Sequence, residues 1–278
     1  MTLSHYLVTS VTILLYRHLK VRGTGMAEFE GKVALVTGGG SGIGRESALG
    51  FAHGGAKIVV ADVDEVGGNE TVDMVSAVGS EAIFVRTDVS KPGEVETAVA
   101  AAVERFGGLN IVINNAGIGG EANLTGDYSL EDWHKVIDIN LNGVFYGMRY
   151  GIPAILASGG GSVVNVSSIL GLVGWSTAPA YVAAKHGVSG LTKAAATEYA
   201  QQGIRVNSVH PGFIETPLLT KTGITPGTDG YNFIASKHAM NRLGTADEVA
   251  NLIVWLASDE ASFVTGSNMT VDGGYTCQ

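Results

Sequence analysis

The amino-acid sequence predicts an α/β protein built around a doubly wound parallel sheet. From Lys32 onward, short runs rich in β-branched residues alternate with alanine-rich segments that show helical spacing. Several of these runs are apolar almost throughout, as is typical of strands that are buried on both faces of a parallel sheet. The alternation therefore predicts a single domain whose helices cross over on both faces of the sheet.

The elements follow one another in a regular order. Strands are expected over residues 33–37, 57–62, 82–89, 109–117, 162–167, 204–212 and 269–274, and helices over residues 42–55, 91–107, 129–156, 178–203 and 245–261. Several of the helical segments begin with polar residues and end at glycine. The long irregular segment at about 217–240 carries glycine and proline and follows the sixth strand. Ligands bind at the carboxyl ends of such strands, so we expect this segment to form a mobile lid.

Composition excludes several classes of protein. The 278 residues carry a formal net charge of −9, and they contain no basic cluster of the kind that nucleic-acid binding requires. Cys277 is the one cysteine, which excludes an intrachain disulfide and a cysteine-based metal site and favours a cytosolic setting. No metal is expected for the chemistry, because the histidines lack metal-ligand spacing. A hydrophobic fraction of 45% predicts a large core that is extended by oligomer interfaces.

Residues 1–25 form an extension before the first strand. They contain an apolar run followed by basic residues, but the run is shorter than the ~20 residues of a spanning helix. The positive charge also follows the apolar run, whereas in a secretory signal it comes first. We expect a disordered tail or an artefact of the start site, with an interfacial anchor or a partner-binding helix as the alternatives. The domain proper is expected over residues 26–278, and membrane association is not expected.

A glycine-rich turn follows the first strand and precedes the first helix. Its glycines Gly38, Gly42 and Gly44 allow backbone N–H groups to approach a pyrophosphate, and the helix N-terminus favours negative charge. Asp62 ends the second strand, eighteen residues after Gly44. A carboxylate at that point accepts hydrogen bonds from both hydroxyls of an adenine ribose and repels a 2′-phosphate. With Ser41 in the turn and no base beside Asp62, the pattern predicts NAD rather than NADP.

From about residue 30 to the end, the sequence resembles the short-chain dehydrogenase/reductase family. The resemblance rests on motifs that occur in the family's order: TGGGSGIG at 37–44, DV at 88–89, NNAG at 114–117, IN at 139–140, NVSS at 165–168, YVAAK at 181–185, HPGFIET at 210–216 and DGG at 272–274. It implies a Rossmann-type sheet of about seven strands and a nicotinamide cofactor. It also implies a catalytic tetrad formed by Asn140, Ser168, Tyr181 and Lys185.

The resemblance extends the set of expected cofactor contacts beyond the glycine turn. The full set comprises Gly38, Ser41, Gly42, Ile43, Gly44, Asp62, Asp88, Val89, Asn115, Gly117, Tyr181, Lys185, Pro211, Ile214 and Thr216. By the same resemblance, Asn140 distorts its helix locally and holds a water in a proton relay to Lys185. The family commonly forms tetramers. One expected helix should expose four small residues, Ala183, Ala184, Gly187 and Gly190, which suit close packing against another helix, so we expect a homotetramer or a dimer.

The tyrosine and lysine of the YVAAK motif have a chemical reason to lie together. Tyr181 and Lys185 are one helical turn apart and face the same side. A phenol is a poor base at neutral pH, but a nearby ammonium stabilises the phenolate. Tyr181 is therefore expected to act as general acid and base, with the Ser168 hydroxyl holding the substrate oxygen.

Apolar side chains lie in the segments expected to contact the substrate. These side chains include Leu170, Trp175, Phe213 and Leu218. The same segments contain no arginine that could bind a carboxylate or phosphate. We expect an apolar alicyclic, aromatic or steroid-like secondary alcohol or ketone as substrate. Two alternatives stay open: a 3-oxoacyl thioester reductase, and a nucleotide-sensing module on the same fold that binds without turnover.

Overall fold

The computed structural model of the chain describes residues 28–278, so the expectations for residues 1–25 lie outside the described residues. Seven parallel strands form one sheet in the order β3-β2-β1-β4-β5-β6-β7. Their bounds are β1 Val33–Thr37, β2 Lys57–Asp62, β3 Ala82–Arg86, β4 Ile111–Asn114, β5 Gly161–Val166, β6 Ile204–Pro211 and β7 Asn268–Val271. The strand order reverses its direction between β1 and β4, which makes the fold doubly wound. The predicted sheet is confirmed.

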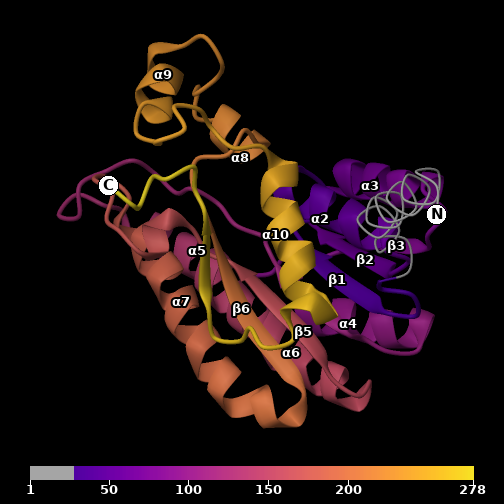
Figure 1. The fold of residues 1–278 in the computed structure, drawn as a ribbon. Coiled ribbons are helices and arrows are strands. Elements are labelled where there is room, and N and C mark those ends of the chain that lie inside the picture. Colours follow the sequence, from indigo (N-terminus) through magenta and orange to yellow (C-terminus); the bar gives the residue numbers. More distant parts are fainter. Residues whose placement is uncertain (1–27) are drawn as a thin grey trace, which may run out of the picture.

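Helices cover both faces of the sheet (Figure 1). Their bounds are α2 Gly42–His53, α3 Glu65–Ala77, α4 Pro92–Phe106, α5 Leu130–Ile137, α6 Gly143–Ala157, α7 Pro179–Tyr199, α8 Pro217–Thr220, α9 Asp229–Ala235 and α10 Ala246–Ala257. Alternate strand residues point to opposite faces: Val36 packs with α2 and α10, whereas Leu35 packs with α4, α6 and α7. Both side chains are fully buried, which explains why the strands read as continuous apolar runs.

Helix α3 has no counterpart among the predicted helices. Its sequence contains Gly67 and Gly68, and glycine weakens a helix by about 1 kcal/mol relative to alanine. The structure shows why these positions lack side chains. A Cβ on Gly68 would lie 2.2 Å from the Phe84 ring, and one on Gly67 would lie 2.7 Å from the Gly40 carbonyl. The glycines let α3 pack closely on β3 and on the glycine-rich turn.

The segment predicted to be a lid contains the short helices α8 and α9. It has a small core of its own, in which Ile234, Ala235 and Leu243 are buried against Phe213 and Leu219. Figure 1 shows α8 and α9 above one end of the sheet, with α9 projecting furthest. This placement puts the segment beside the carboxyl ends of the strands.

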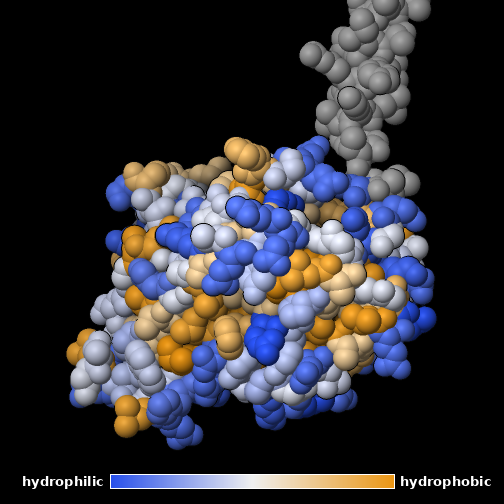
Figure 2. Space-filling view, turned by 90° about the horizontal axis from the view of Figure 1, so that it is seen from below, coloured by the Kyte–Doolittle hydropathy of each residue, from blue (hydrophilic) through white to orange (hydrophobic). Residues whose placement is uncertain are grey.

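The surface carries scattered apolar groups. On the face seen from below, apolar side chains gather in several groups that polar side chains separate (Figure 2).

On α7, Ala183 and Gly190 are exposed as expected. The expectation was wrong for two other residues, because Ala184 is fully buried and Gly187 packs against Leu141, where an added Cβ would lie 2.9 Å from a methyl group. No helix within residues 28–278 is both long and apolar enough to cross a membrane.

Candidate active site

A cavity of about 380 Å³ opens at the carboxyl ends of β4, β5 and β6. Its lining includes Ser168, Tyr181 and Lys185, together with residues of the segment after β6 and of α8. Of the expected cofactor contacts, this cavity is lined by Ile43, Asn115, Gly117, Tyr181, Lys185, Pro211, Ile214 and Thr216. The fold therefore brings the tyrosine–lysine pair next to the residues expected to surround the nicotinamide.

The glycine-rich turn leads into the N-terminus of α2, which has no side-chain cap from Ser41. Gly38 and Gly42 have positive φ values of 63° and 52°, which favour glycine. Gly44 has no room for a side chain, because a Cβ there would lie 2.1 Å from the Gly38 carbonyl oxygen. Ser41 precedes α2 but makes no capping hydrogen bond with its side chain. The first-turn amides of α2 are therefore not capped by Ser41, and they suit a phosphate anion.

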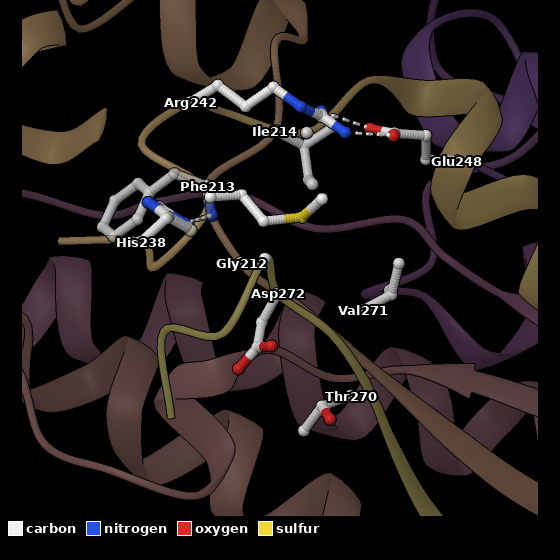
Figure 3. Close-up of a pocket in the computed structure, with 12 residues that line it drawn as sticks. Gly212, Phe213, Ile214, His238, Arg242, Glu248, Thr270, Val271 and Asp272 are labelled. Carbon is white, nitrogen blue, oxygen red and sulfur yellow. Dashed lines mark hydrogen bonds and ion pairs between the residues drawn. The ribbon is translucent and has the colours of Figure 1, made fainter. Parts of the chain in front are cut away.

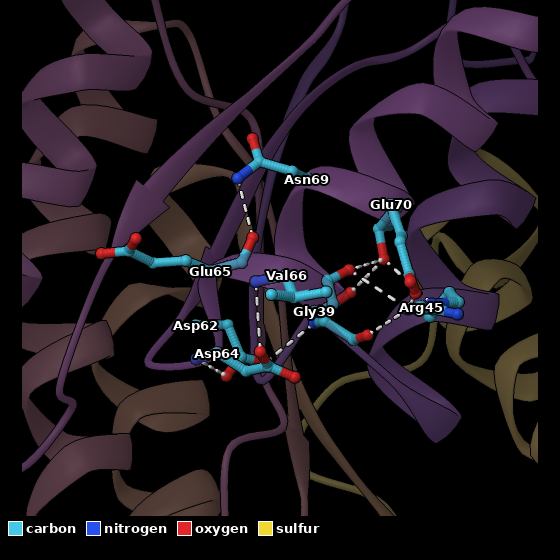
Figure 4. A network of polar contacts seen from close by, with 11 residues as sticks. Gly39, Arg45, Asp62, Asp64, Glu65, Val66, Asn69 and Glu70 are labelled. Carbon is cyan, nitrogen blue, oxygen red and sulfur yellow. Dashed lines mark hydrogen bonds and ion pairs between the residues drawn. The ribbon is translucent and has the colours of Figure 1, made fainter.

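Asp62 stands beside this turn at the end of β2. One carboxylate oxygen accepts a hydrogen bond from Gly40 N at 2.8 Å, and the other accepts one from Asp64 N at 3.0 Å. Figure 4 shows Asp62 and Asp64 between the turn and the start of α3. Each oxygen keeps a second lone pair, so Asp62 can also accept hydrogen bonds from a ribose.

Arg45 is a base near this site that the sequence pattern did not reveal. Its guanidinium donates to the Gly40 carbonyl at 2.5 Å and pairs with Glu70 at 2.9 Å (Figure 4). Arg45 also donates to Thr71 Oγ1 at 3.0 Å. Because these groups hold and partly neutralise the guanidinium, Arg45 supports the turn and does not stand free to bind a 2′-phosphate.

The remaining expected cofactor contacts lie along the same edge of the sheet. Val89 is buried beneath the start of α6, and Asp88 follows β3. Burial would raise the pKa of Asp88, but hydrogen bonds from Ser90 and Lys91 outweigh it and lower the pKa. Asn115 donates its amide to the carbonyls of Thr37 and Gly38 at 3.0 and 3.1 Å, so it also holds the glycine-rich turn in place.

Tyr181 and Lys185 lie together on the first turns of α7. The Lys185 side chain is 3% exposed, and its Nζ lies 5.5 Å from the centre of the Tyr181 ring. Nζ donates a hydrogen bond to the Val166 carbonyl at 2.8 Å. Burial lowers the pKa of Lys185 to about 8. Burial raises the pKa of Tyr181, and a hydrogen bond with Ser168 opposes that increase. In this structure, therefore, desolvation favours the neutral phenol.

Ser168 is held by a buried histidine that the sequence pattern did not single out. His210 is fully buried on β6, and its Nδ1 lies 2.8 Å from the Ser168 carbonyl oxygen. The next residue, Pro211, has no N–H with which β6 could continue its ladder. The Nδ1–H group of His210 instead donates a hydrogen bond to the Ser168 carbonyl oxygen. Only the folded chain reveals this role, because Ser168 and His210 are 42 residues apart.

Asn140 lies in a π-helical turn, Asp138–Asn142, between α5 and α6. Such turns are rare and frequently occur at functional sites. The side chain is 0% exposed, and it accepts from Ile118 N at 2.8 Å and donates to the Ile118 carbonyl at 2.7 Å. A Cβ on Gly117 would lie 3.2 Å from Asn140 and 3.7 Å from Lys185 Nζ. The fold thus brings all four expected tetrad residues to one region.

The expected substrate contacts all line the same cavity. These are Leu170, Trp175, Phe213 and Leu218. The Trp175 and Phe213 rings pack edge to face with their centres 5.5 Å apart. Among the lining residues, Lys185 and Glu121 are the charged ones. Glu121 accepts a hydrogen bond from Ser129 N at 2.6 Å and was not predicted, because a lone glutamate in a loop carries no distinctive sequence signal.

The chain is similar to known proteins over most of its length. A family model described as enoyl-(acyl carrier protein) reductase matches residues 38–276. The chain is 49% identical over 249 residues to a cyclohexanol dehydrogenase of Acinetobacter sp. (strain SE19), covering 90% of this chain and 96% of the relative. It is 41% identical over 245 residues to a 3-alpha-(or 20-beta)-hydroxysteroid dehydrogenase of Mycobacterium tuberculosis, covering 88% of this chain and 89% of that one.

A solved structure shows the same fold. Carveol dehydrogenase from Mycobacterium avium in complex with NAD superposes with a TM-score of 0.86 at 32% identity, covering 91% of this chain and 100% of that chain. The named relatives are dehydrogenases that are matched over most of their length. The chain belongs to the short-chain dehydrogenase/reductase family of oxidoreductases.

Proposed function

We propose that this protein is an NAD-dependent oxidoreductase that interconverts a neutral, hydrophobic secondary alcohol and its ketone. The observation that carries the proposal is the cavity itself. Its lining combines the polar side chains of Ser168, Tyr181 and Lys185 with the apolar side chains of Leu170, Trp175 and Phe213. A hydroxyl group held at the first set leaves the carbon skeleton of the substrate against the second.

The residues of the cofactor region fit NAD. The uncapped start of α2 suits the pyrophosphate, and the Asp62 carboxylate suits the adenine ribose. Carveol dehydrogenase, which shares the fold, was solved in complex with NAD, and this supports the same choice here. When bound, NAD supplies the hydride acceptor for alcohol oxidation.

The chain itself supplies positioning and proton transfer. In the proposed mechanism the Ser168 hydroxyl orients the substrate oxygen, and the Tyr181 phenolate takes the hydroxyl proton as the carbonyl forms. The Lys185 ammonium lies 5.5 Å from the centre of the Tyr181 ring, and a cation near a phenol favours the phenolate. In this proposal Lys185 opposes the effect of burial on Tyr181. Asn140, beside Lys185, lies where it can hold a water that passes the proton outward.

The proposed substrate class is a neutral ring-bearing secondary alcohol, either alicyclic, aromatic or steroid-like. The apolar wall favours such a skeleton, and Glu121 disfavours an anion. Cyclohexanol and hydroxysteroids appear in the names of two relatives, which supports the same class for this chain.

A panel of alcohols tests the proposal. NAD reduction should be measured with cyclohexanol, a hydroxysteroid, an acidic sugar and 3-hydroxyacyl thioesters, and NAD binding should be measured in parallel. The expected result is the highest kcat/KM with cyclohexanol or the steroid. Higher kcat/KM with thioesters would favour a 3-oxoacyl thioester reductase, and binding without turnover would favour a nucleotide sensor.

Asp62→Asn is expected to narrow the preference for NAD over NADP. The asparagine oxygen can still accept from Gly40 N, but the negative charge that repels a 2′-phosphate is lost. We expect kcat/KM for NAD to fall about tenfold and the NAD:NADP ratio to fall by at least as much, since one charged hydrogen bond contributes about 1.5–3 kcal/mol.

The matched control is Asp64→Asn. Asp64 lies in the same turn and caps α3 through Val66 N at 3.1 Å. This variant should keep the cofactor ratio of the wild type. An unchanged ratio in Asp62→Asn, measured by initial rates with both cofactors, would contradict the assignment.

Glu121→Gln is expected to admit anionic substrates. The glutamine oxygen can still accept from Ser129 N, so the loop keeps its contact while the negative charge at the cavity disappears. We expect kcat/KM for 4-hydroxycyclohexanecarboxylate to rise about fivefold, which corresponds to ~1 kcal/mol of repulsion. With cyclohexanol, kcat/KM should change less than about twofold.

Asp127→Asn serves as the control for this charge. Asp127 is exposed on the same loop and does not line the cavity. Removing its charge should leave the ratio of the two substrates unchanged. If both variants changed the ratio of the two kcat/KM values equally, the net charge of the protein, and not Glu121, would set the preference for the neutral substrate.

We further propose that the chain assembles as a homotetramer or dimer in the cytosol. Exposed apolar residues on neighbouring helices support association, including Phe145 on α6 and Leu130 on α5. The segment 217–240 is proposed to act as a mobile lid, since it borders the cavity and packs around a small core of its own.

A further inference from the structure

His238 is a buried imidazole that the proposed mechanism does not use. It follows α9 at the end of the lid segment and is 3% exposed. Figure 3 shows its ring directed at the backbone of Gly212 and Phe213, where the chain leaves β6. His238 therefore connects the lid segment to the strand end that carries two residues of the active-site cavity, Phe213 and Ile214.

The two ring nitrogens of His238 have different partners. Nδ1 lies 2.9 Å from the Ile234 carbonyl oxygen, which can only accept a hydrogen bond. Nε2 lies 3.2 Å from Phe213 N, which can only donate one. These partners together require the neutral imidazole with its proton on Nδ1. If the proton were on Nε2, the Nε2–H donor would face the Phe213 N–H, which is also a donor.

At this point of the chain the imidazole replaces a backbone hydrogen-bond acceptor. Gly212 N donates to the Val271 carbonyl at 3.1 Å, and the Phe213 carbonyl accepts from Gly244 N at 3.0 Å. The N–H of Phe213 pairs with Nε2 of His238 instead. A Cβ on Gly212 would lie 2.8 Å from Nε2, so the glycine allows this close approach.

The same contact orients the Phe213 ring. Its centre lies 5.9 Å from the His238 ring and 5.5 Å from the Trp175 ring. Tyr275, near the C-terminus, packs against both Phe213 and His238. Phe213 and Trp175 line the proposed substrate cavity, so a shift of the Phe213 backbone would alter its apolar wall.

We propose that neutral His238 is a positioning residue, which holds Phe213 in the substrate cavity and thereby supports ketone binding. The inference rests on the proposed function. If the Nε2 acceptor is removed, the Phe213 N–H must move or stay unpaired. The part of the cavity wall that Phe213 forms is therefore ordered by this acceptor.

The charged groups around His238 are already paired. Asp272 faces the ring, but its oxygens accept from Gly274 N at 3.1 Å, Thr276 N at 2.9 Å and Thr276 Oγ1 at 2.6 Å. Arg242 and Glu248 line a second cavity, which His238 also lines, and they pair with each other at 2.6 Å (Figure 3). The Tyr275 ring lies 5.2 Å from the imidazole. These groups therefore have partners of their own, and Nε2 of His238 is the acceptor that the structure shows for Phe213 N.

Reduction of cyclohexanone by NADH at pH 7.5 tests the proposal. Variants of His238 leave the tetrad unchanged, so KM for the ketone reports on the cavity wall and kcat reports on the chemistry. We expect the KM of His238→Leu for cyclohexanone to be about tenfold above that of the wild type while kcat changes less.

His238→Gln and His238→Leu separate positioning from a merely structural role. A glutamine oxygen can accept from Phe213 N, so the KM of His238→Gln should stay within about twofold of the wild-type KM. His53→Gln, at an exposed histidine on α2, should also keep the wild-type KM. A normal KM in His238→Leu, or a KM that is raised as far in His238→Gln as in His238→Leu, would overturn the proposal.

A substrate-independent readout keeps this test distinct from the proposed function. Trp175 emission should differ between the wild type and His238→Leu, change little in His238→Gln, and be identified by its loss in Trp175→Phe. If cyclohexanone is not reduced at pH 7.5, the proposed function fails, and the emission data still decide the role of His238. An emission change that is as large in His238→Gln as in His238→Leu would refute that role.

Discussion

Replacing Tyr181 with phenylalanine is expected to lower kcat by about 10³-fold or more, with cyclohexanol and NAD as the assay pair. The variant lacks the hydroxyl that exchanges the proton, and general acid–base groups contribute roughly 10²–10⁴-fold. Positioning by Ser168 is weakened as well, because the Ser168 hydroxyl interacts with the phenol and opposes the increase in its pKa. Steady-state rates and NAD binding should be measured on the same preparation. The dissociation constant for NAD should change less than about twofold.

A second tyrosine on the same helix provides the control. Tyr199 ends α7 and packs against the hydrophobic core on the α4, α6 and α7 side of the sheet. Tyr199→Phe should keep kcat within about twofold of the wild type. If Tyr181→Phe retained normal activity while still binding NAD, Tyr181 would not be the acid–base group.

Lys185→Met is expected to produce an inactive protein that is more stable than the wild type. The substitution removes the cation that favours the Tyr181 phenolate, so kcat should fall by at least about 10²-fold. It also removes a buried charge. Methionine has a similar length and no charge to desolvate. Activity and the free energy of unfolding should be measured together, because the two are expected to change in opposite directions.

The stability gain from Lys185→Met depends on pH with a definite sign. The pKa of Lys185 is about 8 in the folded protein, below the ordinary value of 10.5. Below pH 8 the lysine is protonated in both states, and burial of its charge costs about 3 kcal/mol at about 1.4 kcal/mol per pH unit. Loss of the hydrogen bond to the Val166 carbonyl offsets about 1–2 kcal/mol of this. We expect a net gain of about 1–2 kcal/mol at pH 7.

Between pH 8 and pH 10.5 the unfolded wild type binds more protons than the folded protein, so its stability rises with pH. The advantage of Lys185→Met should therefore shrink over this range in urea unfolding experiments. Lys193→Met, at an exposed lysine on the same helix, should change neither kcat nor the pH dependence. A variant that is less stable than the wild type at pH 7 would show that the buried ammonium stabilises the fold.

Some elements of the fold were predictable to the residue and others were not, for physical reasons. The bounds of β1 and β2 were predicted correctly, because both strands are buried on two faces and consist of apolar runs. α3 was missed because its glycines suppress the helical signal, although they permit close packing. The expected exposure of Ala184 was wrong, since small residues suit a buried contact as well as an interface.

The residues proposed for catalysis could be named from the sequence, whereas the residues that contact them could not. Tyr181 and Lys185 are one helical turn apart, so their proximity follows from local geometry. Ser168 and Asn140 were named through the resemblance to the family. Arg45, Glu121, His210 and His238 were assigned no function, because a single charged or imidazole side chain is common in any sequence.

The parallel sheet, the glycine-rich turn, the acidic residue after β2 and the tyrosine–lysine pair could therefore all be read from the sequence. Each is encoded by residues that are close together in the chain or by a repeating pattern of apolar runs. The folded chain was needed to show that His210 holds Ser168, that His238 holds Phe213 and that Glu121 is the one acidic residue among those lining the described cavity. Hydrogen bonds between distant segments and the walls of a cavity depend on how the strand ends and loops pack together, which no local pattern records.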